Sequence, residues 1–449
     1  MIFMTKDLTV GSPMKLILGF AVPLLFGLLL QQMYSLVDTM IVGKMLGANA
    51  LAAVGASGSI NFLVLGFCMG LCAGFAIPIA QRFGAKDMKG LRKYLANSMW
   101  LCIIASVVLT TVTVILCNWI MKVMKTPDEI YTEACGYIRI MFMGIPVIIL
   151  YNMLSGIIRS LGDSKTPVIF LAMAAVLNVF LDILFIAVFK TDASGTALAT
   201  VIAQGISGIA CFFYMKKKFP ELAIQPDELK WRKKYVKNLC LTGVPMGLQY
   251  SVTAIGSVIL QSAVNTLGTA AVAAMAAASK LSFFFNCPYD ALGTTMATYG
   301  GQNVGAGKLD RLTKGLVSAS GLGIVYAILA FVVLYIFAPE LCLLFVNSES
   351  TEIISLMKEF LVINSSFYVL LVLVNVVRFM IQGMGFGIFS IFSGLSEMVA
   401  RALFGFIFVP MFGFTAACFA SPAAWLFADM FLIPGYIYCL KRLKKQQNE

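Results

Sequence analysis

The chain has 449 residues, of which 60% are hydrophobic and 12% are charged, and its formal net charge is +12. A soluble protein carries about 25% charged residues, so this composition excludes an ordinary soluble enzyme or binding domain. Apolar stretches of about 20 residues recur along the chain, and each is long enough to cross a bilayer as a helix. We therefore expect an all-α polytopic membrane protein. The positive charge lies in its loops, and we expect no nucleic-acid partner.

Twelve membrane-spanning helices are expected. In chain order their approximate ranges are 15–43, 49–80, 94–120, 130–158, 167–189, 195–215, 238–265, 270–300, 315–338, 353–380, 388–410 and 414–440. The first range lacks the small-residue cleavage pattern of a signal peptide, so it is expected to stay in the membrane. The 11 cysteines lie almost all inside these ranges and form no CxxC pair. We interpret them as small buried side chains, and we expect no structural metal and no cofactor.

The Lys and Arg residues predict the orientation of the chain. An even number of spans places both termini on the same side of the membrane. One set of loops and termini, which includes Lys6, holds 24 of the 33 Lys and Arg residues, and the opposite set, which includes Lys125, holds five. Cytoplasmic loops carry the excess of positive charge. We therefore predict a multi-pass protein of the plasma (cytoplasmic) membrane with both termini in the cytoplasm.

The sequence also repeats itself. Residues 46–54, LGANALAAV, match residues 267–275, LGTAAVAAM, and a proline lies near the start of each half, at Pro23 and Pro245. Six spans per copy return the chain to the same face, so the copies are expected to be parallel repeats about an axis along the membrane normal. The predicted parts are an N-lobe over 1–217, a cytoplasmic linker over 218–236 and a C-lobe over 237–449. Two six-helix lobes are expected to surround a central cavity.

Two acids interrupt apolar helices of the N-lobe: Asp38 in LVDTMIVG and Asp182 in VLNVFLDIL. At 1.5 Å per residue, Asp38 lies about 9 Å, Asp182 about 12 Å and Thr200 about 8 Å from the outer ends of their helices. Asn178 lies one turn before Asp182. Intramembrane acids are usually functional because burying a charge in lipid is costly. Two carboxylates in a poorly hydrated pocket repel, so at least one is expected to hold a proton or a cation. The oxygen ligands leave both H⁺ and Na⁺ open.

Other polar residues within the spans are weaker candidates. Four of them could line a substrate cavity: Gln31, Tyr34, Lys280 and Asp290. The last two could instead pair with Glu397 or Asp429. Glu397 and Arg401 are spaced i, i+4 and are expected to neutralise one another. Pro23 should kink the first span and is a candidate hinge, static or moving.

One stretch predicts how two helices pack. GFCMGLCAG at 66–74 places small residues at i, i+4 and i+8. Such a spacing lets helix backbones approach closely in a membrane. We therefore expect close helix packing along this stretch.

Several segments together resemble the MATE family of multidrug and toxic-compound extruders. They are the Gln31, Tyr34 and Asp38 face of the first span, RSLGDSKTP at 159–167, N-x-x-x-D at 178–182 and GTALAT at 195–200. The resemblance covers essentially the whole chain and is most similar to the DinF-like branch. It implies a proton- or sodium-binding cluster of Asp38, Asn178, Asp182 and Thr200, and a first-helix proline at Pro23. Other branches carry acids in the seventh and tenth spans, where this chain has Gln261 and Arg378.

These observations favour a secondary antiporter, not an enzyme. We expect a monomer in the lipid bilayer that exports amphipathic, mostly cationic organic compounds in exchange for H⁺ or Na⁺. One alternative is a lipid-linked precursor flippase of the same superfamily, which would need a strongly cationic central cavity. The other is a receptor or scaffold without transport, which would need neither duplicated lobes nor paired acids at one depth.

Overall fold

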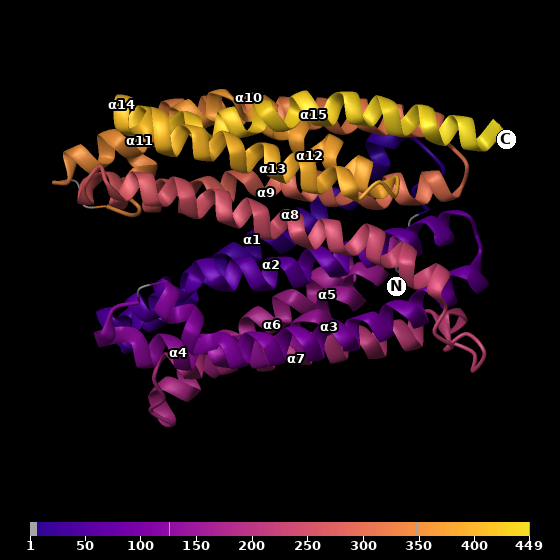
Figure 1. Ribbon diagram of the computed structural model, residues 1–449, viewed down its shortest axis with the longest axis horizontal. Coiled ribbons are helices and arrows are strands. Elements are labelled where there is room, and N and C mark those ends of the chain that lie inside the picture. Colours follow the sequence, from indigo (N-terminus) through magenta and orange to yellow (C-terminus); the bar gives the residue numbers. More distant parts are fainter. Residues whose placement is uncertain (1–6, 125, 347–348, 449) are drawn as a thin grey trace. The chain divides into compact units, whose positions relative to one another are not determined.

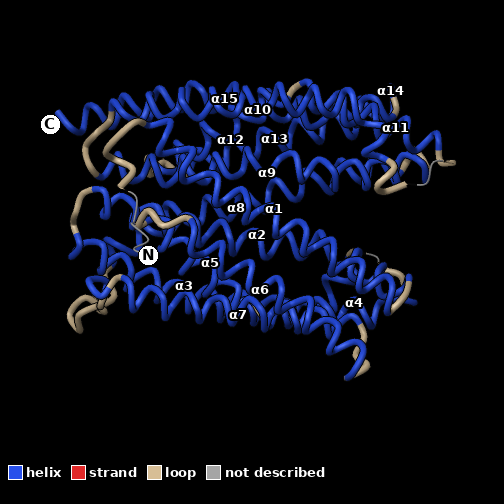
Figure 2. The backbone as a smooth tube through the Cα atoms, turned by 180° about the vertical axis from the view of Figure 1, so that it is seen from behind, coloured by secondary structure: helices blue, strands red, loops and turns tan. Residues whose placement is uncertain are grey.

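The computed structural model describes residues 7–124, 126–346 and 349–448, and every regular element in these ranges is a helix (Figures 1 and 2). Lys6 and Lys125, which the orientation count includes, lie outside the described residues. The elements are α1 (Pro13–Met45), α2 (Ala48–Gly84), α3 (Met88–Val123), α4 (Asp128–Met143), α5 (Ile145–Ser160), α6 (Lys165–Ile183), η1 (Leu184–Val188), α7 (Ala193–Lys218), η2 (Pro220–Leu222), α8 (Lys233–Asn265), α9 (Thr269–Gly305), α10 (Asp310–Cys342), α11 (Thr351–Ser366), α12 (Tyr368–Gly383), α13 (Ile388–Leu403), η3 (Phe404–Phe408), α14 (Val409–Phe412) and α15 (Phe414–Asn448).

The described helices confirm the predicted membrane architecture. Ten of them are long and apolar enough to cross a bilayer, and the number is twelve when two bent pairs, α4–α5 and α11–α12, each count as one span. All 11 cysteines are free thiols, as expected from their positions within apolar helices. α1 continues as one helix through Pro23. The hinge role of that proline stays a prediction.

Two spans that we expected to be unbroken, 130–158 and 353–380, are each a bent pair of helices. α4 and α5 meet at 46° around Gly144, and α11 and α12 meet at 53° around Phe367. Pro146, in the first turn of α5, lacks a backbone N–H. Proline is tolerated there because that N–H has no partner within the helix, which explains why a new helix begins at this point.

The second bend has a different cause. Ser365 Oγ donates to the Val362 carbonyl at 3.2 Å, and Ser366 Oγ donates to the Ile363 carbonyl at 2.7 Å. Serine hydroxyls that bond to the preceding turn compete with the backbone ladder and bend helices. The two serines lie directly before the bend, so they account for its position.

The two halves of the chain share the same sequence of elements. α1 and α8 each have 33 residues, α2 and α9 each have 37, and each bent pair consists of two 16-residue helices. A π-helical turn follows α6 as η1 and α13 as η3. Gly47 and Gly268 precede α2 and α9 with φ of 92° and 100°, a left-handed conformation that glycine adopts at low cost. The repeat read from short sequence matches therefore extends to helix lengths and helix breaks.

The helices form two compact units. Of the described residues, the first unit contains Asp7 and those between 26 and 247, and the second contains those between 8 and 25 and between 248 and 448. Within the first unit α5 packs against α2 and α7, and α6 packs against α7; within the second, α12 packs against α9 and α15, and α13 against α15. These pairs correspond to each other in the repeat. The lobe limits predicted above, 1–217, 218–236 and 237–449, stay a prediction.

The small residues of α2 do pack closely, as predicted. A Cβ atom on Gly74 would overlap the backbone of Gly243, and one on Gly70 would lie 2.5 Å from the Met246 carbonyl oxygen. Gly243 and Met246 belong to the first part of α8, which lies in the same unit. Glycine at these positions of α2 therefore permits the contact.

The segment between α7 and α8 is held against α3 in the first unit. Arg92 Nε donates to Glu228 Oε2 at 2.8 Å, Trp100 Nε1 donates to the Leu229 carbonyl at 2.9 Å, and Arg232 N donates to Asn97 Oδ1 at 2.9 Å. The Arg92 guanidinium keeps the pKa of Glu228 below its usual value, and the backbone N–H of Gln225 adds to this effect against the opposing effect of burial. The linker is therefore fixed to the first unit.

Candidate functional site

The structure brings together the four residues predicted to bind a cation. Asp38 lies on α1, Asn178 and Asp182 lie on α6, and Thr200 lies on α7, all within the first unit. Asp182 is fully buried, and Asn178 and Thr200 are 1% and 7% exposed. The carboxyl groups of Asp38 and Asp182 lie within hydrogen-bonding range of each other. Such a bond requires that one of the two groups carries a proton.

Asn178 connects the acids to α7. In one orientation, both the nitrogen and the oxygen of its side-chain amide form hydrogen bonds. Nδ2 then donates to Asp182 Oδ2 at 3.2 Å, and Oδ1 accepts from Thr200 N at 3.1 Å and from Thr200 Oγ1 at 3.3 Å. The i, i+4 spacing of Asn178 and Asp182 places both side chains on one face of α6. An asparagine in this orientation holds the carboxyl group and the hydroxyl group at a fixed separation.

Two tyrosines complete the cluster. Tyr34 of α1 lies near Thr200 and within electrostatic range of Asp38 and Asp182. Tyr137 of α4, which is 8% exposed, also lies within range of both acids. Tyr137 could not be identified from the sequence, because a single tyrosine in the apolar helix YIRIMF is typical of a core residue. Only the packing of α4 shows that it faces the acids.

The acids have no buried cation as a partner in the described part of the chain. No Lys or Arg nitrogen there lies within 4.0 Å of a carboxylate oxygen of Asp38 or Asp182. One oxygen of each group, Oδ1, is buried without a hydrogen-bond donor among the described residues. Arg139, the cation on α4, donates instead to Asn118 Oδ1 at 2.8 Å. A fixed ion pair therefore does not neutralise the two acids, and a buried carboxylate without a donor costs several kcal/mol.

The remaining candidates do not join this cluster. Gln31 lies on α1, and no hydrogen bond of its side chain is found in the described ranges. Lys280 and Asp290 lie on α9 in the second unit. Neither forms an ion pair with Glu397 or Asp429 in the described part of the chain, so that alternative is wrong. The cavity-lining roles predicted for Gln31, Tyr34, Lys280 and Asp290 stay predictions.

The pairing predicted for Glu397 is confirmed and extended. Arg401 Nη2 lies 3.7 Å from Glu397 Oε2, as the i, i+4 spacing predicted. Arg378 of α12 makes a closer contact, between its Nη2 and Glu397 Oε1. This second partner could not be predicted from the sequence, because it comes from another helix.

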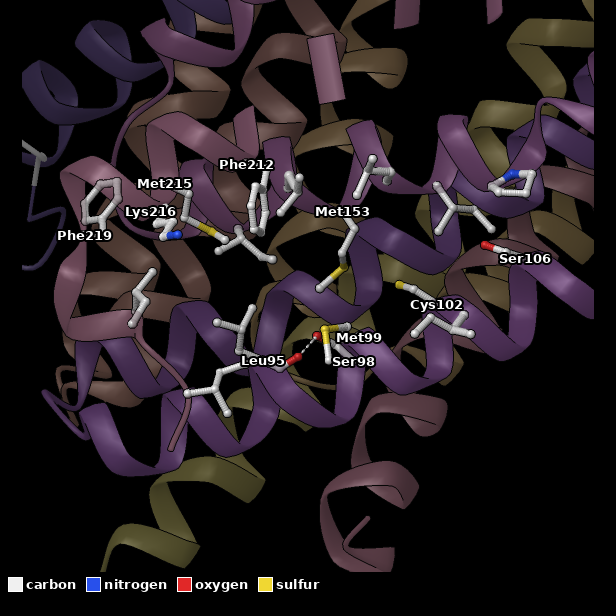
Figure 3. A pocket seen from close by; sticks show the side chains of 18 of the residues that line it. Leu95, Ser98, Met99, Cys102, Ser106, Met153, Phe212, Met215, Lys216 and Phe219 are labelled. Carbon is white, nitrogen blue, oxygen red and sulfur yellow. Dashed lines mark hydrogen bonds between the residues drawn. The ribbon is translucent and has the colours of Figure 1, made fainter. Parts of the chain in front are cut away.

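A hollow lies elsewhere in the first unit. It has a volume of about 880 Å³ and is lined by α3, α5, α7 and the segment after α7. Figure 3 shows its labelled lining: Leu95, Ser98, Met99, Cys102, Ser106, Met153, Phe212, Met215, Lys216 and Phe219. Lys216 is the only charged residue in this lining. The hollow contains none of the predicted cation-binding residues, so its size does not make it the ion site.

Comparison with known proteins identifies the family. A sequence profile of the MatE family matches the chain twice, over residues 23–184 and 245–407. The chain belongs to the MatE family. The two matched ranges correspond to the two halves of the internal repeat. As a member of this family, the protein is a membrane transporter.

Individual relatives agree with this assignment. This MatE chain is 34% identical over 307 residues, 68% of either chain, to a Bacillus subtilis protein named probable multidrug resistance protein YpnP. It is 29% identical to the B. subtilis probable multidrug resistance protein YoeA, over 74% of this chain and 73% of that one. A solved MATE structure in complex with MaL6 has the same fold, with a TM-score of 0.92, 23% identity, and coverage of 98% and 100% of the two chains. The DinF-like branch stays a prediction.

Proposed function

We propose that this MatE transporter is a secondary antiporter, not an enzyme, that exports amphipathic, mostly cationic organic compounds in exchange for H⁺. The observation that carries the proposal is the contact between the carboxyl groups of Asp38 and Asp182. Their membrane position follows from the sequence, and Asn178 and Thr200 hold the second acid in place. The names of the relatives YpnP and YoeA support a drug-like cargo.

A proton suits this pair better than Na⁺. Two carboxyl groups that share a hydrogen bond already need one proton, and the two buried Oδ1 atoms provide places for it. Na⁺ would need several oxygen ligands around one point. Asn178 Oδ1 already accepts from Thr200 N and Thr200 Oγ1, so the two carboxyl groups are the main oxygen ligands left for a metal cation. Na⁺ is therefore the second candidate for the coupling ion.

Proton binding can drive transport by changing the charge of the pocket. With one proton bound the pair carries a single negative charge, and with two it is neutral. One charge that crosses 100 mV supplies about 2.3 kcal/mol, or about fiftyfold in the gradient of a neutral substrate. Exchange of one H⁺ for a monovalent cation moves no net charge, so the pH gradient alone drives it. We propose that the protein lies in the plasma membrane as a monomer with both termini in the cytoplasm.

Dye transport by the reconstituted full-length protein tests the proposal. Liposomes are loaded with a fluorescent organic cation, and a pH gradient or a Na⁺ gradient is imposed separately on wild type and Asp38→Asn. We expect the pH gradient to accelerate dye movement at least tenfold in wild type and not in the variant. The matched control is Asp310→Asn, because Asp310 is an exposed acid that pairs with Lys444 at 3.3 Å.

Each outcome has a distinct meaning. Equal dye movement in wild type and Asp38→Asn under every gradient would disprove coupling through these acids. A response to the Na⁺ gradient alone would replace H⁺ by Na⁺ as the coupling ion. Absence of dye transport together with binding of a lipid-linked pyrophosphate would favour the flippase.

A further inference from the structure

The second unit contains its own buried group of charges on three packed helices. Arg378 lies on α12, Glu397 and Arg401 lie on α13, and Asp429 lies on α15; all four are at most 8% exposed. α15 packs against both α12 and α13. Glu397 accepts from Arg378 through one oxygen, and Arg401 Nη2 lies 3.7 Å from the other. Arg401 also donates to the Thr253 carbonyl at 3.5 Å.

Asp429 differs from Glu397 in having no such partner. Its side chain is 3% exposed, and both carboxylate oxygens are buried without a hydrogen-bond donor among the described residues. Arg378 Nε is likewise buried without an acceptor. An ionised carboxylate in this position would lack both water and donors, which costs several kcal/mol. A neutral carboxylic acid avoids most of that cost.

The charges around Asp429 determine which ligand fits. Arg378 and Glu397 are the charged groups whose fields act on it, and their effects are opposed. α11 also packs against α15, but its Glu359 accepts from Thr415, which is 14 residues and about 21 Å along the helix from Asp429. η3 and α14 contribute no ionisable residue. A metal cation next to a guanidinium would be repelled, whereas a proton adds to an oxygen and leaves a neutral group.

We propose that Asp429 is a proton-binding site in the second unit, and that Arg378 replaces the proton when Asp429 ionises. In this step the O–H bond of the Asp429 carboxylic acid breaks, the proton passes to water, and the electron pair stays on the carboxylate. The Arg378 guanidinium then turns from Glu397 toward Asp429, while Arg401 keeps the charge of Glu397 paired. Asp290 on α9 also lies within the field of Arg378.

This exchange is local to one unit. Arg378 lies on α12, so its movement between Glu397 and Asp429 exchanges a contact with α13 for one with α15. The proposal is independent of the Asp38 and Asp182 cluster, because no residue is shared and the two groups lie in different units.

Infrared spectroscopy of the reconstituted full-length protein tests the proposal directly. A protonated carboxyl group has a C=O stretching band separate from that of a carboxylate, and the band shifts in D₂O. We expect wild type at pH 7 to have a component of this band, in addition to that of the Asp38 and Asp182 pair, that is absent in Asp429→Asn and retained in the exposed control Asp310→Asn. An identical protonated-carboxyl region in wild type and Asp429→Asn would overturn the proposal.

A second variant separates the arginine movement from protonation and does not depend on the folding of Asp429→Asn. Glu397→Gln removes the acid that competes for Arg378 and leaves Asp429 in place. We expect the Asp429 band to weaken severalfold at pH 7, because Arg378 is then available to Asp429. A band of unchanged intensity in Glu397→Gln would overturn the exchange. Unchanged dye coupling in Asp38→Asn, together with a band that disappears in Asp429→Asn, would disprove coupling through Asp38 and support proton binding at Asp429, so the two proposals can fail separately.

Discussion

Gly74 lies where α2 approaches the first part of α8 closely enough for the two backbones to touch. A methyl group at this position would overlap the backbone of Gly243, which cannot turn aside as a side chain could. Overpacking of this kind costs about 1–3 kcal/mol. We therefore expect Gly74→Ala to lower the melting temperature of the purified protein in detergent, as measured by the fluorescence of a thiol-reactive dye.

A glycine on the same helix provides the control for that prediction. A Cβ atom added to Gly58 of α2 would have no neighbouring atom within 4 Å beyond its own turn of the helix. Alanine favours a helix over glycine by about 1 kcal/mol, so Gly58→Ala should leave the melting temperature unchanged or raise it. Equal losses in both variants would mean that the approach of α2 and α8 does not depend on glycine.

The same scale shows which site residues could be predicted from the sequence. Asp38 and Asp182 stand out because acids are rare in apolar spans, and the four-residue spacing to Asn178 places it on the same helix face. The position of Tyr137 within electrostatic range of the acids could not be predicted, since it depends on how α4 packs against other helices of the first unit. The second partner of Glu397, Arg378, was missed for the same reason. Contacts within a helix follow from spacing, but contacts between helices require the packing.

At the scale of elements, the predicted spans follow from the apolar stretches, whereas their breaks do not. The bend at Gly144 has a local signal in Pro146, although helices often continue through a proline, as α1 does at Pro23. The bend at Phe367 depends on two serine hydroxyl groups that donate hydrogen bonds to backbone carbonyls of the preceding turn. The attachment of the linker to α3 also escaped prediction, because its basic composition is typical of a solvated loop.

The contact between the linker and α3 predicts a pH-dependent stability. Its Arg92–Glu228 pair joins a group that is 2% exposed to one that is 21% exposed, and a hydrogen bond to a charged group contributes about 1.5–3 kcal/mol. Because folding lowers the pKa of Glu228, the contribution is complete above the ordinary glutamate pKa of about 4.3 and disappears as pH falls through the lower folded value. Glu228→Gln should therefore melt below wild type at pH 7.

The difference in melting temperature between wild type and Glu228→Gln should become smaller as the pH falls below about 4. Melting curves in detergent at pH 7, 5 and 3 check this expectation, with Glu221→Gln as the control. Glu221 is an exposed acid of the same segment whose carbonyl, not its side chain, accepts from Arg92. A gap between wild type and Glu228→Gln that widened toward low pH would contradict an ionised Glu228 in the folded protein.

At the scale of the whole molecule, the repeat determines where the compact units begin and end. The boundary within α1 falls after Leu25, two residues beyond Pro23, and the boundary within α8 falls after Gly247, two residues beyond Pro245. In both helices the part before the proline belongs to a different unit from the part after it. A proline lacks the N–H that would bond to the preceding turn, so it weakens a helix at its own position. Each long helix is thus weakest close to the point where it changes unit.

This coincidence predicts how alanine at Pro23 should act. Alanine restores a backbone N–H and removes a cost of about 3 kcal/mol for proline inside a helix, so Pro23→Ala should raise the melting temperature. If α1 bends during transport, the added hydrogen bond of about 0.5–1.5 kcal/mol must break in each cycle, which slows dye efflux by about two- to tenfold. Pro245→Ala should act in the same direction, and Pro78→Ala, inside α2 of a single unit, is the matched control. A variant at Pro23 that gains stability and keeps the wild-type efflux rate would mean that the proline is a static feature of the helix.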